Sequence, residues 1–149
     1  MSDTAPGAHK APPACLRVLL LDDDSFMLEL LHEMLKEVGN FEVFLETAAK
    51  RALATLASAS PDLLICDLSM PDMDGIEFMH AAADAGFSGC VMLLSGMDAG
   101  VRKAAERLAR AHGLRVLGAY KKPISQAELR AALAPLIAGE PHACQGQQD

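Results

Sequence analysis

The feature that most constrains the fold is a regular alternation of short apolar runs with amphipathic segments. Five apolar runs are predicted to be strands, near residues 16–21, 41–45, 63–66, 90–94 and 114–119. Each is followed by a segment with helical spacing of apolar residues, near 26–38, 48–57, 75–85, after 98, and from 125 to about 137. The runs are continuously apolar, which indicates strands covered on both faces. Strict strand–helix alternation predicts a doubly wound α/β fold with a parallel sheet and right-handed crossovers.

Several helix ends are marked in the sequence. Ser25 is predicted to cap the first helix, and Gly39 to end it. Asp98 is predicted to cap the fourth helix. Ser125-Gln-Ala-Glu128 has the pattern of a capping box and opens the last helix.

Carboxylates follow two of the predicted strands at the point where each strand ends. The third strand ends on Asp67, just before a Pro-bearing turn, and the first ends on the run Asp22-Asp23-Asp24. Because the carboxyl ends of parallel strands share one edge of a sheet, these acids are expected to meet there. Three of them, Asp22, Asp23 and Asp67, are expected at the strand ends themselves. Three ionised carboxylates in one crevice repel each other, and a cation would offset that repulsion. All-oxygen ligands make Mg²⁺ the natural choice.

Two further polar residues are expected at the same edge. Ser95 follows the fourth strand, and Lys122 follows the fifth and precedes Pro123. Taken singly, each of these residues has an ordinary structural role in a turn or on the surface. Taken together at four strand ends, the acids, the hydroxyl and the ammonium form a seat for a phosphoryl group attached to, or attacked by, a carboxylate.

Length and composition fit one domain and exclude several classes of function. The chain has 149 residues, 51% of them hydrophobic, enough for one core. A net charge of −7 argues against direct nucleic-acid binding. No apolar run approaches the ~20 residues of a membrane span. Four cysteines without C-x-x-C spacing, and no signal-peptide core, predict a reduced, cytoplasmic setting. Residues 1–14 are predicted to be a disordered tail, 15–138 the domain, and 139–149 a flexible tail.

With these residues in this order, the chain resembles the receiver domains of two-component response regulators. The resemblance covers residues 16 to about 137. It rests on four segments taken together and in order: Leu-Leu-Leu-Asp22-Asp23-Asp24, Cys-Asp67-Leu-Ser-Met-Pro71-Asp-Met-Asp74-Gly75, Leu-Leu-Ser95-Gly and Lys122-Pro123. It implies a flavodoxin-like, five-stranded parallel sheet of order 2-1-3-4-5 with five helices, and a signalling switch rather than an enzyme.

The resemblance also implies a role for each acid. Asp67 would be the phosphoacceptor, taking its phosphoryl group from a histidine kinase or a phosphotransfer protein. Asp23 and Asp67 would bind Mg²⁺ directly together with the backbone carbonyl of Ser69, and Asp22 would act largely through water.

The same resemblance assigns the remaining site residues and the partners. Ser95 would be the switch hydroxyl, Lys122 would pair with the phosphoryl group, and the Lys122–Pro123 peptide would be cis. The face formed by helix 4, strand 5 and helix 5 would bind an output domain or protein, or a second copy after phosphorylation. Residues 113–124 resemble receivers that precede cyclic-di-GMP phosphodiesterase domains.

One position departs from the family pattern. Many receivers carry an aromatic residue three positions before the lysine, where this chain has Ala119, and the aromatic here is Tyr120. Strand alternation puts the two side chains on opposite faces. We therefore predict that no aromatic toggle operates at the output face.

Two other functions use the same residue types. A haloacid-dehalogenase-like phosphatase also combines an aspartyl phosphate with Mg²⁺, a hydroxyl and a lysine, and Asp22-Asp23-Asp24 satisfies its Asp-x-Asp opening. Its nucleophile lies on the first strand, however, and an acidic pair comes late, which does not match the order here. A signalling-inactive interaction module of the same fold is the third alternative, and the complete set of site residues argues against it.

Overall fold

The structure is a computed structural model that describes residues 15–70, 75–96 and 98–138. It contains five strands, each followed by a helix. The strands are β1 (Leu16–Leu21), β2 (Phe41–Glu46), β3 (Leu63–Asp67), β4 (Cys90–Ser95) and β5 (Arg115–Lys121). The helices are α1 (Ser25–Lys36), α2 (Ala49–Ala59), α3 (Gly75–Asp84), α4 (Ala99–Ala111) and α5 (Gln126–Ile137).

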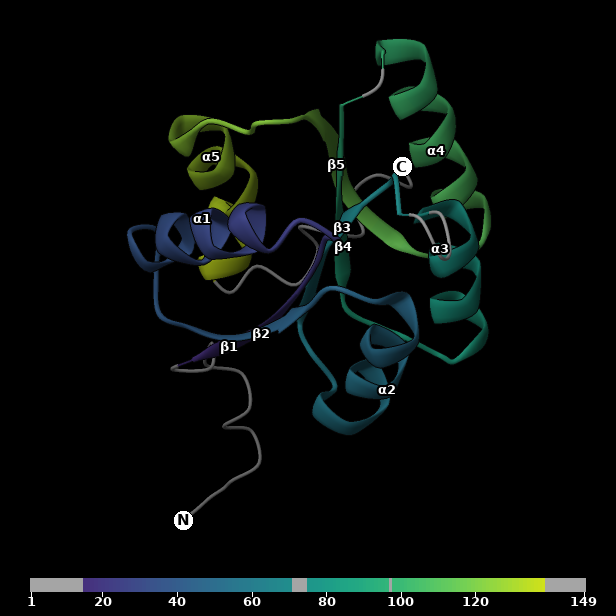
Figure 1. The fold of residues 1–149 in the computed structure, drawn as a ribbon, viewed down its shortest axis with the longest axis horizontal. Helices are drawn as coiled ribbons and strands as arrows, with labels where there is room; N and C mark the ends of the chain where they lie inside the picture. The colour runs from purple at the N-terminus through teal and green to yellow at the C-terminus, as the bar shows by residue number, and fades with distance from the viewer. Residues whose placement is uncertain (1–14, 71–74, 97, 139–149) are drawn as a thin grey trace.

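The strands form one parallel sheet of order β2-β1-β3-β4-β5. Helices α1 and α5 cover one face, and α2, α3 and α4 cover the other (Figure 1). The predicted flavodoxin-like fold is therefore confirmed. From β1 the chain runs outward to β2 at the edge of the sheet, and from β2 it returns past β1 to β3. The direction in which strands are added therefore reverses between β1 and β3. This is where sites form in sheets of this kind.

Two apolar cores lie on the two faces of the sheet, as the continuous apolar runs predicted. Along β1, Val18 and Leu20 face α1 and α5, while Leu19 and Leu21 face the other three helices. Both layers are almost completely shielded from water: the residues of β1, β3 and β4 from Val18 onward are at most 5% exposed. Burial on both faces stabilises this centre by about 1.5–3 kcal/mol for each large aliphatic side chain.

The start of α1 differs from the prediction. Asp24, not Ser25, is the N-cap residue, and its carboxylate accepts hydrogen bonds from the backbone N–H groups of Phe26 and Met27. Asp24 is itself positioned by Asp22, whose Oδ1 accepts the Asp24 N–H at 2.9 Å. A carboxylate caps a helix start as well as a hydroxyl and also favours the positive end of the helix dipole. The caps predicted at Asp98 and Ser125 are confirmed.

Strand β5 contains an irregularity that the sequence did not indicate. Val91 of β4 pairs with Val116, but the next residue, Met92, pairs with Gly118. After this bulge Ala119 packs toward α2–α4, and Tyr120 packs toward α1 and α5. The predicted placement of these two side chains on opposite faces is therefore confirmed.

Some predictions fall on residues that the structure does not describe. These are the tails at 1–14 and 139–149 and the turn from Pro71 to Asp74. Among the helices in the described ranges, none has both the length and the apolar character needed to cross a bilayer.

Candidate functional site

Four strand ends bring the predicted site residues together at the carboxyl edge of the sheet. Asp67 and Ser95 are the last residues of β3 and β4, Asp22 directly follows β1, and Lys122 directly follows β5. The backbone N–H of Lys122 donates to the Ser95 carbonyl at 2.9 Å, which closes β5 onto β4 at this edge. Asp22, Asp67 and Ser95 are 1%, 3% and 0% exposed. Polar side chains are rarely buried this deeply unless a partner satisfies them.

Three carboxylates meet at this point. One oxygen from each of Asp22, Asp23 and Asp67 lies within 4.8 Å of the other two. Asp23 is exposed, whereas the other two are buried, so the cluster opens to solvent on the Asp23 side. Three oxygen donors with an open side suit a hard cation that retains several water molecules, as Mg²⁺ does.

Lys122 supplies the positive charge of the site. Its Nζ lies 3.0 Å from Oδ2 of Asp22 and 3.4 Å from Oδ2 of Asp67, so it is held more closely by Asp22. Burial lowers the pKa of Lys122, but the hydrogen bond to Asp22 and the charges of both carboxylates outweigh it, and the net shift is upward. The lysine is therefore firmly charged.

The Asp67 carboxylate lies among groups that shift its pKa in opposite directions. Burial raises its pKa to about 6, and the charge of Asp22 adds to this, although the Ser69 N–H and Lys122 act in the opposite direction. The Ser69 N–H donates to Oδ1 at 3.1 Å, while Oδ2 faces Lys122. A carboxylate with this pKa is ionised above about pH 6 but poorly stabilised by the protein alone.

The described part of the site therefore carries more negative than positive charge. One ammonium group faces three carboxylates, two of which are buried. Removing a charge from water without full compensation is costly. The arrangement fits a divalent cation, and a metal-bound carboxylate at the end of a rigid strand can act as a nucleophile or as an electrostatic anchor.

Cys66 lies directly behind the acids. Its thiol is fully buried and donates to the Asp67 backbone carbonyl at 3.3 Å. Burial, followed by the charges of Asp67 and Asp22, raises the pKa of the Cys66 thiol far above its usual range. It is a packing residue, as its place inside an apolar run predicted.

The structure places Asp22, Asp23, Asp67, Ser95 and Lys122 at this edge of the sheet. The Lys122–Pro123 peptide is cis, as predicted. The sequence missed the role of Asp24, whose carboxylate is used to cap α1 and is not part of the cluster. The position directly before an amphipathic segment was a signal that could have identified this cap.

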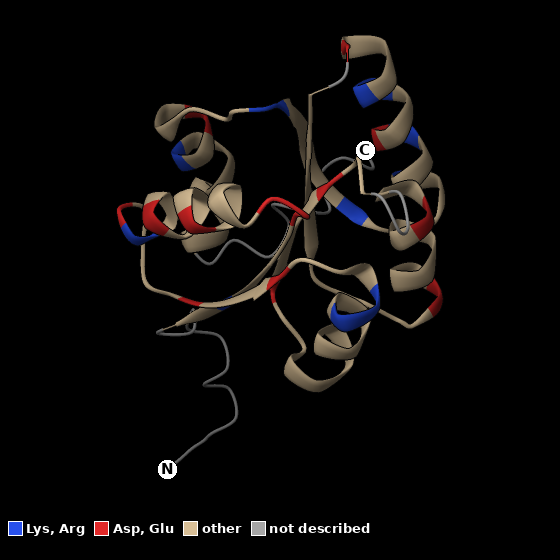
Figure 2. Ribbon diagram, in the orientation of Figure 1, with Lys and Arg blue, Asp and Glu red and all other residues tan. Residues whose placement is uncertain are grey.

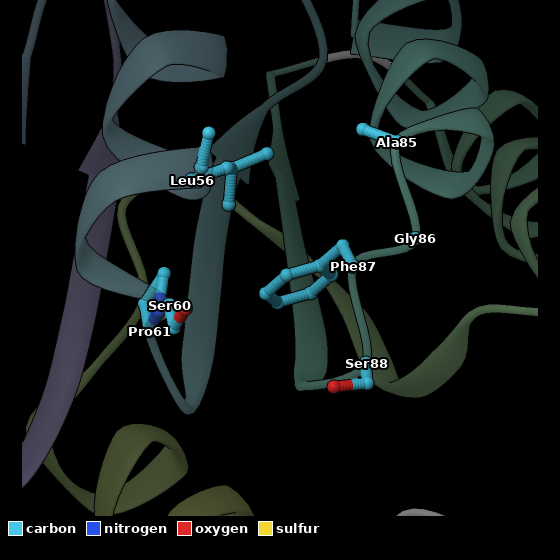
Figure 3. A pocket seen from close by; sticks show the side chains of 8 residues that line it. Leu56, Ser60, Pro61, Ala85, Gly86, Phe87 and Ser88 are labelled. Atoms are coloured by element: carbon cyan, nitrogen blue, oxygen red, sulfur yellow. The ribbon is translucent and has the colours of Figure 1, made fainter.

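A cavity of about 210 Å³ lies away from the acids, between the ends of α2 and α3 (Figure 3). Leu56 and Phe87 give it apolar walls, and Ser60 and Ser88 lie at its rim (Figure 3). None of its lining residues belongs to the acidic site.

Comparison with known proteins agrees with this geometry. Residues 18–134 match the family model described as the response regulator receiver domain. The cyclic di-GMP phosphodiesterase RocR of Pseudomonas aeruginosa is 34% identical over 119 residues, which is 79% of this chain and 30% of RocR. The cell cycle transcriptional regulator CtrA of Caulobacter vibrioides is 33% identical over 81 residues, which is 54% of this chain and 35% of CtrA. This chain thus spans about a third of the length of these relatives.

Solved structures show the same fold. A response regulator from Colwellia psychrerythraea is 36% identical, with a TM-score of 0.70 over 82% of this chain and 96% of that one. The chemotaxis protein CheY4 of Vibrio cholerae has a TM-score of 0.66 at 24% identity, over 81% of this chain and 98% of that one. The strand order, the four strand ends and these matches lead to one conclusion: the chain belongs to the response regulator receiver family of two-component signal transduction.

Proposed function

We propose that Asp67 is the phosphoacceptor of this receiver and takes its phosphoryl group from a phosphohistidine of a kinase or phosphotransfer protein. The observation that carries this proposal is the environment of Asp67: a carboxylate only 3% exposed, with a pKa of about 6, flanked by two more carboxylates and one lysine. Above about pH 6 the carboxylate is ionised, as a nucleophile must be. Its position at the end of β3 fixes its direction of attack.

In the proposed reaction, a carboxylate oxygen of Asp67 forms a bond to phosphorus as the phosphorus–nitrogen bond to the donor histidine breaks. The electron pair of that bond returns to the imidazole ring. Asp22, Asp23, Asp67 and the Ser69 carbonyl are proposed to hold Mg²⁺, which neutralises charge on the phosphoryl oxygens when bound. Lys122, already within 3.4 Å of Asp67, is proposed to pair with a phosphoryl oxygen.

The signal is proposed to pass from the site to helix α4. Ser95 is fully buried at the end of β4, four residues before α4 begins at Ala99. The phosphorylated carboxylate offers more acceptor oxygens than the free one, so the Ser95 hydroxyl is drawn toward it. This contact exists only in the phosphorylated state and therefore shifts the population of the two states.

The exposed surface of α4 supports a partner with an acidic surface. The helix carries four basic residues, Arg102, Lys103, Arg107 and Arg110, and a single acid, on a chain with a net charge of −7 (Figure 2). Val101 and Leu108 are 40% and 41% exposed beside them. Apolar contacts within a basic surface suit an acidic, partly apolar docking surface. The similarity to RocR supports an output protein of the cyclic di-GMP class.

The test is phosphorylation with acetyl phosphate, and beryllofluoride binding, each with Mg²⁺. Mass spectrometry should show one phosphoryl adduct on the native chain and none on Asp67→Asn. Asp62→Asn is the matched control, because Asp62 lies at the other end of the same strand and should leave the adduct intact. An adduct that survives Asp67→Asn would overturn the proposal. Turnover of p-nitrophenyl phosphate that survives Asp67→Asn but not Asp22→Asn would indicate a phosphatase instead.

A further inference from the structure

A pair of histidines joins α3 to the end of α4, outside the acidic site. His80 lies on α3, and His112 is the residue that caps the end of α4. Nδ1 of His80 lies 3.0 Å from Nε2 of His112. The ring centroids are 4.6 Å apart, and the planes meet at 78°. The two residues are 32 positions apart in the sequence, so the fold alone brings them together.

The outer nitrogen of each ring is already held by an acceptor. Nε2 of His80 lies 3.2 Å from a carboxylate oxygen of Asp84, and Nδ1 of His112 lies 2.9 Å from the Leu108 carbonyl oxygen. Carbonyl and carboxylate oxygens only accept hydrogen bonds, so both outer nitrogens carry hydrogen. In neutral rings, the two nitrogens that face each other, Nδ1 of His80 and Nε2 of His112, then both carry lone pairs. Such a contact requires either a shared proton or a cation between the rings.

The ring geometry favours a cation. Two rings aimed straight at each other across a shared proton would place their centroids roughly 5.3 Å apart. The observed separation is 4.6 Å, so the rings are tilted out of line, as they are when both inner nitrogens point at one ion between them. An ion about 2.0–2.1 Å from each nitrogen would see the two nitrogens at about 91–97° and hold the centroids about 4.7 Å apart.

We propose that His80 and His112 are the two protein ligands of a divalent transition-metal site, with Cu²⁺ or Ni²⁺ preferred over Zn²⁺. A near-right angle between ligands matches square-planar and octahedral ions and does not match a tetrahedral one. Imidazole nitrogen suits these borderline ions, and Cu²⁺ forms the strongest complexes of the divalent series. The site is separate from the carboxylate cluster, whose oxygen ligands suit Mg²⁺.

Asp84 is proposed to position His80. Histidine ligands commonly donate their second N–H to a carboxylate or carbonyl, which fixes the ring orientation and makes the ligand more basic. Asp84 plays this part for His80, and the Leu108 carbonyl plays it for His112. The side chains of His80 and Asp84 are 55% and 72% exposed, so an ion can enter from solvent, and water can complete its coordination.

The experiment uses the full chain with saturating Mg²⁺, so that the acidic site is occupied. The chain has five histidines, His9, His32, His80, His112 and His142. One variant, His9→Gln/His32→Gln/His142→Gln, retains only the pair, and a second, His80→Gln/His112→Gln, retains only the other three. Pulsed electron paramagnetic resonance of bound Cu²⁺ should show two imidazole nitrogens on one ion in the first variant and not in the second. Calorimetry should give at least about 10-fold weaker Cu²⁺ binding in the second.

Asp84→Asn adds a test of the positioning role. It should weaken Cu²⁺ binding by about 10-fold while the two-imidazole spectrum persists, because both ligands remain. Glu33→Gln, on the distant helix α1, is the matched control and should change neither. A single imidazole per ion in the pair-only variant, or equal affinity with and without the pair, would overturn the proposal. Beryllofluoride binding should be normal in all these variants, which separates failure of this site from failure of the phosphoacceptor.

Discussion

The two ends of strand β3 use similar residues to opposite effect. At its amino end, the carboxylate of Asp62 accepts the backbone N–H of Arg17 at 2.8 Å, and the Arg17 guanidinium donates to the Ala59 carbonyl at 2.7 Å. Each charged group there has a partner within the fold. At the carboxyl end, one lysine faces three carboxylates. Buried or paired acids therefore do not by themselves mark a site. The unbalanced charge marks it.

The largest expected effect comes from two glycines that touch the two ends of β3. A Cβ at Gly75 would lie 2.5 Å from Cα of Leu68 and 3.0 Å from the Asp67 carbonyl, and a Cβ at Gly89 would lie 2.7 Å from the Asp62 carbonyl. Gly75→Ala and Gly89→Ala should each lower the free energy of unfolding by about 2–3 kcal/mol, because backbone must move. Urea denaturation measures this loss.

The two glycine variants should differ in their effect on the site. Gly75→Ala displaces Asp67 and should weaken beryllofluoride binding, whereas Gly89→Ala should leave that binding intact in the folded fraction. Equal effects of both variants on binding would show that the two ends of the strand are not independent.

The next effect is the change in stability when an acid is neutralised, and it should have opposite signs at the two ends of β3. At pH 7.5 without Mg²⁺, Asp67→Asn should raise the free energy of unfolding by about 1–2 kcal/mol, because it removes a buried charge whose pKa is raised to about 6. Asp62→Asn should lower it by about 1 kcal/mol, because it weakens the bond to Arg17. Thermal melts with and without Mg²⁺ measure both changes. Destabilisation by Asp67→Asn in the metal-free protein would contradict the picture of unbalanced charge.

The pH dependence follows from the same raised pKa. The pKa of Asp67 in the folded protein, about 6, lies above the ordinary aspartate value of 3.8. The proton on Asp67 therefore stabilises the metal-free fold at low pH, and this contribution is lost as the pH rises through about 6. Protons compete with Mg²⁺, so Mg²⁺ affinity should fall by up to about 10-fold per pH unit below 6. Calorimetric titrations from pH 7.5 to 5 measure it, and a flat profile would refute the assignment.

The smallest effect is expected at Tyr120, on the other side of β5 from Ala119. Tyr120→Phe should change the free energy of unfolding by less than about 0.5 kcal/mol. Tyr120→Leu, which removes the ring, should leave the beryllofluoride-induced change in hydrogen exchange of α4 intact, because we predict that no aromatic toggle operates there. Ser95→Ala is the contrasting variant and should remove most of that change. Loss of the α4 response in Tyr120→Leu would show that the tyrosine ring takes part in signalling.

The sequence predicted the features that depend on local pattern. The strands, the helices and the meeting of Asp22, Asp67 and Lys122 follow from apolar periodicity and from the shared edge of parallel strands. The choice of Asp24 over Ser25 as helix cap did not follow, because both residue types cap helices, and the hydrogen bond that the Asp24 backbone N–H donates to Asp22 becomes visible only in the structure.

Features that depend on contacts between distant segments were not predictable. The bulge before Gly118 is a matter of register between β4 and β5, and the ring of Tyr120 lies over the space that a Cβ there would occupy, 3.1 Å away. The pairing of His80 with His112 depends on how α3 and α4 pack, and neither residue stands out in the sequence.

Cys66 bears on the choice of nucleophile. A thiolate beside an incoming phosphoryl group would compete with the carboxylate for it and would be open to oxidation. Burial and the adjacent acids raise the pKa of this thiol, so it stays protonated, and its hydrogen is directed to the Asp67 backbone carbonyl. Burial and the charge of Asp22 thus raise the pKa of both Asp67 and its sequence neighbour, and the phosphoryl transfer that we propose is left with a single acceptor at the end of the strand.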